Sequence, residues 1–153
     1  MEQLPYLERV KIQSEILLPL YRRLRKELGS ERAAALLREA VAEYATNLGQ
    51  SIAQIIPGTG LEKVKVLMPM FTAGNALDVE PISNNETELF LNVRGCKYAE
   101  HFKSIGEPEF GAMLTCEMDP PMMEGIGSDV RMDRTQTIAT GGTHCDFRWK
   151  ATK

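Results

Sequence analysis

Two short stretches in the second half of the chain contain residue types that can do chemistry. The first is CEMDP, residues 116–120, in which Cys116 and Asp119 are three positions apart. Positions three apart share one face of a helix, so we expect this thiol and this carboxylate to point the same way. We expect Pro120 to push Asp119 out of helical geometry and to leave the carboxylate at a helix end, facing a pocket.

A thiol beside a carboxylate is not yet an activated nucleophile. The negative charge of Asp119 raises the pKa of a neighbouring thiol, so Cys116 needs a cationic or hydrogen-bonding partner to form a thiolate. The second stretch, GGTHCDFR at residues 141–148, contains such groups. Alternate side chains of a strand face opposite sides. One face is expected to carry His144, Asp146 and Arg148, and the other to carry Cys145, Phe147 and Trp149.

Each of these residues also has an interpretation without chemistry. A free cysteine is more often a small buried apolar residue than a nucleophile, and this applies to each cysteine taken alone. Cysteine, histidine and aspartate also bind zinc, but the chain has no C-x-x-C and no H-x-x-x-H spacing. We therefore expect no metal and no cofactor. His101, in a short polar stretch, is expected at the surface.

Composition and charge exclude several classes of protein. A chain of 153 residues with 43% apolar and 25% charged side chains fits one globular domain, residues 1–153. The net charge of −3, with both signs mixed, argues against nucleic-acid binding. No run approaches the roughly 18 apolar residues of a membrane span, and no signal-peptide pattern is present. The three widely spaced cysteines indicate reduced thiols, so we expect a cytoplasmic protein with no membrane partner.

The first half of the chain is predicted to be helical. Apolar side chains recur at helical spacing over residues 5–28 and 31–56. Gly29 is a natural stop for the first helix and Ser30 a natural N-cap for the second. Pro19 is expected to kink or divide the first helix. The amphipathic first helix is also compatible with a homo-oligomer.

The second half is predicted to form a sheet with inserted helices. Residues 61–71 are ambiguous, and a helix is slightly favoured there. Strands are predicted at 76–82, 86–93, 129–139 and 144–150, and short helices at 97–105 and 109–118. Pro120-Pro121 is expected to end the second short helix. The resulting fold class is α+β, with an N-terminal helical half packed on a C-terminal antiparallel sheet of about four strands with two short inserted helices.

The motifs around these elements are similar to those of a known family. They are Cys96-x-Tyr98-Ala99, Gly106-x-Pro108-Glu109, Cys116-x-x-Asp119, Arg134-Thr135-x-Thr137 and Gly141-Gly142-x-x-Cys145-Asp146-Phe147-Arg148. With them the chain resembles the L-2-amino-thiazoline-4-carboxylic acid hydrolase family, and more distantly the 4-vinyl reductase type of ligand-binding domain. The layout agrees over most of the chain, but the specific motifs lie between Cys96 and Arg148.

The resemblance implies a hydrolase that opens a small cyclic amidine or cleaves a related C–N bond. Water adds to the amidine carbon between sulfur and nitrogen, and the ring opens to an N-carbamoyl cysteine. That carbon becomes tetrahedral, so the site needs a base or nucleophile and a proton donor to the leaving nitrogen. It also needs a cation for the substrate carboxylate.

Roles for individual residues follow from the resemblance and from side-chain chemistry. Cys116 would attack the amidine carbon or position the water, and Asp119 would hold the protonated amidine or shuttle protons. His144 would be their acid or base partner on chemical grounds alone. The catalytic candidates are thus Cys116, Asp119, His144, Cys145 and Asp146. The substrate-binding candidates are Arg134, Arg148 and Thr137, with either arginine gripping the carboxylate.

Two other interpretations remain beside the hydrolase. The same cysteine-lined pocket would serve a non-catalytic module that binds a small molecule or a metal. In an assembly protein, the cysteines would only pack. A reactive Cys116 of low pKa favours the hydrolase. A stoichiometric metal with unreactive thiols favours the binding module. Cys→Ser variants that lose stability but no ligand effect favour the assembly protein.

Overall fold

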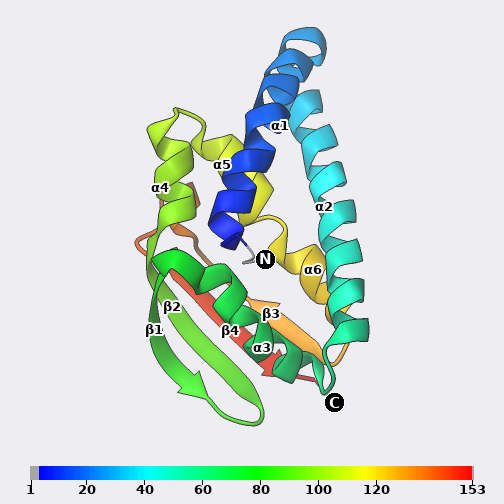
Figure 1. Cartoon of the computed structure of the whole chain (residues 1–153), viewed down its shortest axis with the longest axis vertical. Coiled ribbons are helices and arrows are strands. Elements are labelled where there is room, and N and C mark those ends of the chain that lie inside the picture. The colour runs from blue at the N-terminus through cyan, green and yellow to red at the C-terminus, as the bar shows by residue number, and fades with distance from the viewer. Residues whose placement is uncertain (1–3, 153) are drawn as a thin grey trace.

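Long helices form the first part of the chain and a four-stranded sheet dominates the second (Figure 1). The structure is a computed structural model that describes residues 4–152. Its helices are α1 (Tyr6–Leu28), α2 (Ser30–Ile55), α3 (Gly60–Thr72), α4 (Lys97–Ser104), α5 (Pro108–Thr115) and α6 (Asp119–Ile126). Its strands are β1 (Leu77–Asn84), β2 (Glu88–Cys96), β3 (Val130–Asp133) and β4 (Cys145–Ala151). The predicted α+β class is confirmed, although three short helices rather than two separate β2 from β3.

The helices α1 and α2 form a long hairpin that turns at a single residue. Gly29 adopts a φ of 84°, which residues with a Cβ rarely adopt, and it ends α1 as predicted. The prediction that Ser30 caps α2 is wrong, because Gly29 also occupies the N-cap position and Ser30 is already helical. Pro19 does not divide α1. It lies on an exposed face, where water can satisfy the carbonyl that its missing N–H leaves free.

The ambiguous stretch at 61–71 belongs to a helix. Thr59 and Glu62 form a reciprocal capping box, in which each side chain binds the other's backbone N–H, and this starts α3. Pro69 lies inside α3, close to its C-terminal end. The favoured prediction of a helix is therefore confirmed. Figure 1 shows α3 running in front of the sheet.

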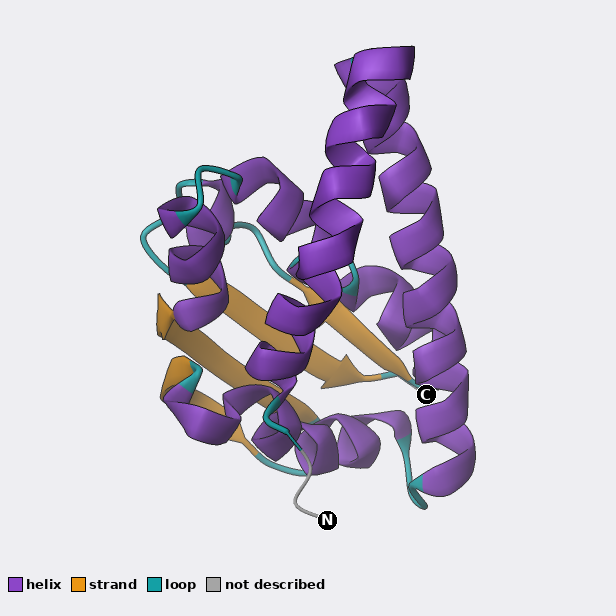
Figure 2. Ribbon diagram, turned by 45° about the horizontal axis from the view of Figure 1, so that its top comes forward, coloured by secondary structure: helices purple, strands orange, loops and turns teal. Residues whose placement is uncertain are grey.

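The sheet is antiparallel throughout, with strand order β1-β2-β4-β3 (Figure 2). The strand β4 therefore lies between β2 and β3. On β4 the pairs Val93↔Cys145 and Leu91↔Phe147 keep a regular register with β2, without a bulge. The predicted alternation from Cys145 onward is thus preserved, whereas His144 lies just before β4 and not in the strand as predicted.

Two predicted boundaries in the second half are wrong for identifiable reasons. Pro120 and Pro121 do not end the helical region, because they occupy the first turn of α6, where a missing N–H costs nothing. Asp119 is therefore the first residue of a helix rather than a residue outside helical geometry. The strand predicted at 129–139 stops at Asp133. Beyond it, the backbone N–H groups of Thr135 and Gln136 donate to the Asp146 carboxylate instead of to a neighbouring strand.

Close packing on α2 positions α6. A Cβ on Gly49 would collide with the carbonyl oxygen of Met122, and a Cβ on Gly125 would collide with that of Thr46. The two helices therefore approach more closely at these glycines than side chains would allow. Because α6 begins at Asp119, this contact also sets the place of that carboxylate.

Part of α1 faces away from the core. Ile12, Ile16 and Leu20, four positions apart, are each more than half exposed. The amphipathic pattern of this helix is compatible with a homo-oligomer, and that oligomer stays a prediction. Within residues 4–152, no helix combines the length and the apolar character needed to cross a membrane.

Candidate functional site

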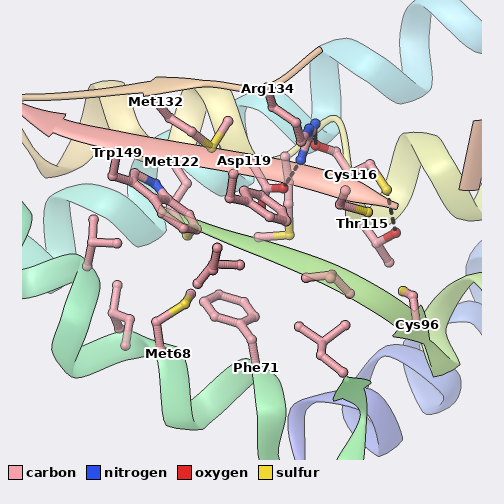
Figure 3. Close-up of a pocket in the computed structure, with 18 of the residues that line it drawn as sticks. Met68, Phe71, Cys96, Thr115, Cys116, Asp119, Met122, Met132, Arg134 and Trp149 are labelled. Carbon is pink, nitrogen blue, oxygen red and sulfur yellow. Dashed lines mark hydrogen bonds and ion pairs between the residues drawn. The ribbon is translucent and has the colours of Figure 1, made fainter. Parts of the chain in front are cut away.

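A cavity of about 90 Å³ lies on the helix-covered face of the sheet. Its walls come from the sheet, from α3 and from the segment that joins α5 to α6 (Figure 3). On β4 the residues that line it are Cys145, Phe147 and Trp149, the predicted common face of that strand. Most other lining side chains are apolar, including Met68 and Phe71 of α3. The cavity thus encloses a largely apolar space.

One ion pair interrupts this apolar lining. Nη1 of Arg134 donates to Oδ2 of Asp119 at 2.5 Å, and Nη2 of Arg134 donates to the carbonyl oxygen of Cys116 at 2.9 Å. The guanidinium also lies over the ring of Phe147, 5.1 Å from its centroid. Only 11% of the Arg134 side chain and 20% of the Asp119 side chain are exposed. Both belong to the lining of the cavity, so this charge pair is available to a bound molecule.

The burial of Asp119 changes its acidity. Removal from water raises the pKa of this carboxyl to about 6, although Arg134 acts in the opposite direction. The carboxyl is therefore mostly ionised at neutral pH but holds a proton more firmly than an exposed aspartate. A group that titrates near the working pH is suited to accept and return protons.

All three cysteines line the same cavity, but they differ in what their sulfur atoms contact. The sulfur of Cys96 accepts the backbone N–H of Ala99 at 3.5 Å and caps α4. The sulfur of Cys145 accepts the backbone N–H of Ile138 at 3.3 Å. Thus two of the thiols support local backbone structure.

The sulfur of Cys116 has a weaker contact, with the hydroxyl of Thr115 at 3.7 Å. Burial raises the pKa of the Cys116 thiol to about 11, and the charge of Asp119 acts in the same direction. Arg134 opposes this shift only in part. At neutral pH, Cys116 is therefore a neutral thiol rather than a thiolate.

The other predicted catalytic residues lie outside the cavity lining. The Asp146 carboxylate accepts the hydroxyl and the backbone N–H of Thr135 and the backbone N–H of Gln136. Removal from water raises its pKa, but these hydrogen bonds outweigh that effect and hold the pKa below its usual value. His144 contacts the hydroxyl of the adjacent Thr143 through Nδ1 at 2.8 Å.

Two of the predicted substrate-binding residues are likewise engaged elsewhere. Arg148 donates to the carbonyl oxygen of Leu91 and to Oδ1 of Asn92, across to β2. Thr137 accepts the backbone N–H of Thr140 and caps the short 3-10 turn that follows. Among the predicted site residues, the fold therefore brings together Cys116, Asp119, Arg134 and Cys145.

One polar group in the cavity wall was not among the predicted site residues. Trp149 is 3% exposed, and within the described part of the chain its indole Nε1 has no hydrogen-bond partner. The alternation along β4 placed Trp149 on the same face as Cys145, which was the available signal. Over the same described residues, no three histidine, cysteine, aspartate or glutamate side chains converge closely enough to hold a metal ion.

Comparison with known families gives the same family as the sequence motifs between Cys96 and Arg148. The family model of L-2-amino-thiazoline-4-carboxylic acid hydrolase matches residues 9–149. The chain belongs to this family. The resemblance drawn from Cys116, Asp119 and the residues after Gly141 is thereby confirmed. A sequence comparison with curated proteins finds no match.

Comparison with solved structures gives two matches to this member of the hydrolase family, and the first shows a similar overall fold. The phenol-responsive sensory domain of the transcription activator PoxR, in complex with phenol, is 13% identical with a TM-score of 0.52. That match covers 99% of this chain and 76% of the other. A trafficking protein particle complex subunit 3 from Naegleria fowleri, covalently bound to palmitic acid, is 11% identical with a TM-score of 0.49, over 94% and 97% of the two chains.

Proposed function

We propose that this hydrolase-family member opens a small cyclic amidine acid, of the 2-aminothiazoline carboxylate type, in the cavity beside Cys116. The observation that carries the proposal is the ion pair of Asp119 and Arg134 in an otherwise apolar wall. Such a substrate has a planar amidinium at one side and a carboxylate at the other. Asp119 complements the amidinium, and Arg134 complements the carboxylate through paired N–H donors.

Asp119 is the general base in this proposal. The pKa of its carboxyl, raised to about 6, leaves it ionised at neutral pH yet basic enough to accept a proton from water. The water oxygen forms a bond to the amidine carbon as Asp119 takes that proton. The apolar walls strengthen the attraction between the carboxylate and the amidinium, because few water dipoles compete with it.

Ring opening to an N-carbamoyl cysteine breaks the bond between the amidine carbon and the ring sulfur. Sulfur is therefore the leaving atom in this reaction, rather than the nitrogen expected from the general scheme. It departs with the bonding electrons and takes the proton held by Asp119 to become a thiol. The second proton of the water passes to solvent as the new carbonyl forms.

Cys116 acts as a neutral group beside the reacting carbon rather than as the attacking nucleophile. The raised pKa of its thiol supports this choice between its two candidate roles. Its sulfur has no backbone donor among the described residues, unlike those of Cys96 and Cys145. It is therefore the thiol with capacity left to orient a water molecule.

The test is ring opening of L-2-amino-thiazoline-4-carboxylic acid, followed by mass spectrometry of the product. We expect Asp119→Asn to lower kcat/KM by about 10²- to 10⁴-fold, the usual contribution of a general base. Glu117→Gln is the matched control, because Glu117 lies two residues away in a half-exposed ion pair with Arg38. No turnover by the wild type, or full activity in Asp119→Asn, would reject the proposal.

The apolar walls also support a second candidate function, in which the cavity binds a small molecule without changing it. The apolar side chains of the cavity offer a large contact area to a small molecule, and this contact needs no catalysis. Calorimetry separates the two functions. Tight binding of the amidine acid with no product after long incubation favours a binding module over a hydrolase.

A further inference from the structure

The cavity has two chemically different ends. On β4 its lining runs from Cys145 through Phe147 to Trp149. A strand rises about 3.3 Å per residue, so the Cα atoms of Cys145 and Trp149 are about 13 Å apart. Figure 3 shows Trp149 at one side of the cavity and Cys96 at the other, with Asp119 between them. We call these the indole end and the thiol end.

The indole end contains a polar group that the protein itself does not satisfy. Nε1 of Trp149 is a buried donor without an acceptor in residues 4–152, and it is the one buried side-chain nitrogen or oxygen there in that state. Buried tryptophans usually donate this N–H, because an unmet donor away from water is costly. An acceptor atom on a molecule bound in the cavity would satisfy this donor.

The wall around the indole can yield to admit such a molecule. Met68, Met122 and Met132 lie around Trp149 in Figure 3. The cavity volume of about 90 Å³ is smaller than the cavity of about 150 Å³ that holds benzene in an engineered protein, so a ring fits only if side chains move. Methionine is unbranched and flexible, which makes these three side chains the ones most able to rotate.

We propose that the indole end is a second subsite, which takes an apolar group carrying a neutral hydrogen-bond acceptor for Nε1 of Trp149. The acceptor is neutral because the methionines around Trp149 carry no charge, and a charged group among them would lose its hydration without compensation. The substrate is then a cyclic amidine with an apolar substituent that ends in a carbonyl or ether oxygen. This last step rests on the proposed function, whereas the subsite does not.

Trp149 is the only tryptophan, so the protein has a single indole N–H resonance. Acetophenone and isopropenylbenzene have the same skeleton, but isopropenylbenzene has a methylene group in place of the carbonyl oxygen. In ¹⁵N-labelled wild-type protein, we expect acetophenone to move the indole proton downfield and isopropenylbenzene to leave it without a downfield shift. Equal shifts from the two probes, or binding of neither, would overturn the subsite.

A variant adds a measurement of affinity. Trp149→Phe keeps an aromatic ring and removes the donor. By calorimetry, we expect the Kd of acetophenone to rise about tenfold and that of isopropenylbenzene to stay unchanged. An equal weakening for both probes overturns the proposal, because it reports lost packing alone. The resonance test on the wild type decides the matter if the variant does not fold.

Neither probe contains an amidine, so this result is independent of turnover. Normal probe binding with no ring opening rejects the proposed hydrolysis and keeps the subsite. Ring opening without any response of the indole N–H to acetophenone rejects the subsite and keeps the hydrolysis.

Discussion

The two faces of β4 use similar side chains for opposite purposes. On the face away from the cavity, Asp146 and Arg148 direct their polar atoms to backbone groups and to Asn92. On the cavity side, Asp119 and Arg134 pair with each other within the lining of an apolar space. The outer pair of charges stabilises chain connections, whereas the inner pair remains open to a ligand.

This difference shows that residue type alone does not determine function. Asp146 matches the family motif as well as Asp119 does, yet its oxygens are occupied by Thr135 and Gln136. A carboxylate can do chemistry only if the fold leaves it within reach of a substrate. The direction of the pKa shift records the same contrast, because it is raised for Asp119 and lowered for Asp146.

The largest effect is expected from removing the inner cation. Arg134→Met leaves the Asp119 carboxylate buried without its partner, which we expect to lower the free energy of unfolding by about 3 kcal/mol at pH 8. The loss should shrink at pH 5, where the carboxyl of raised pKa binds a proton and no longer needs the cation. Urea unfolding at the two pH values measures this.

Arg148→Met on the outer face is the matched control. It removes hydrogen bonds to Leu91 and Asn92 but leaves no buried carboxylate behind. We expect a loss of about 1 to 2 kcal/mol that is the same at pH 5 and pH 8. If both arginine variants showed the same pH dependence, the contrast between the two faces of β4 would fail.

The pH dependence of activity is the next largest effect. The base must be ionised, so kcat/KM should fall about tenfold per pH unit below about 6 and level off above that value. The levelling point reports the pKa of Asp119 in the free protein. A profile that is flat from pH 5 to 8 would show that another group is the base.

A smaller effect of opposite sign is expected from the outer carboxylate. The pKa of Asp146 is lowered by folding, so its stabilising contribution is present above the unfolded value of about 4 and is lost as pH falls through the lower, folded value. Asp146→Ala should therefore cost about 1 kcal/mol at pH 7 and less at pH 3. For Asp119, whose pKa is raised, ionisation between about pH 4 and pH 6 lowers stability.

The smallest effect is expected from labelling of Cys116. Its raised pKa predicts slow reaction with iodoacetamide at pH 7, with a rate that increases towards about pH 11. Mass spectrometry of the peptide with residue 116 measures the rate. Selective labelling below pH 7, blocked by the amidine acid, would instead identify Cys116 as the nucleophile.

Much of the fold was predictable because the deciding signals are local. Helical spacing located α1 and α2, and alternation along β4 separated Asp146 from Cys145. The failures occurred where a distant or capping interaction outweighed the local pattern. Asp146 ended β3 early by accepting backbone N–H groups eleven and ten positions away in sequence. Pro120 and Pro121 lie in the first turn of α6 instead of ending a helix.

The sequence by itself determined the types of most elements, with α6 the exception, together with the two faces of β4, the family and the pair of candidate groups at Cys116 and Asp119. Only the tertiary structure decided which candidates meet. Arg134 reaches Asp119 because β3 lies beside β4 and α6 packs on α2. The spacing of residues along the sequence predicts neither of these contacts. Burial also decided the acidity of Asp119 and Cys116, because desolvation depends on everything that surrounds a group rather than on its neighbours in the chain.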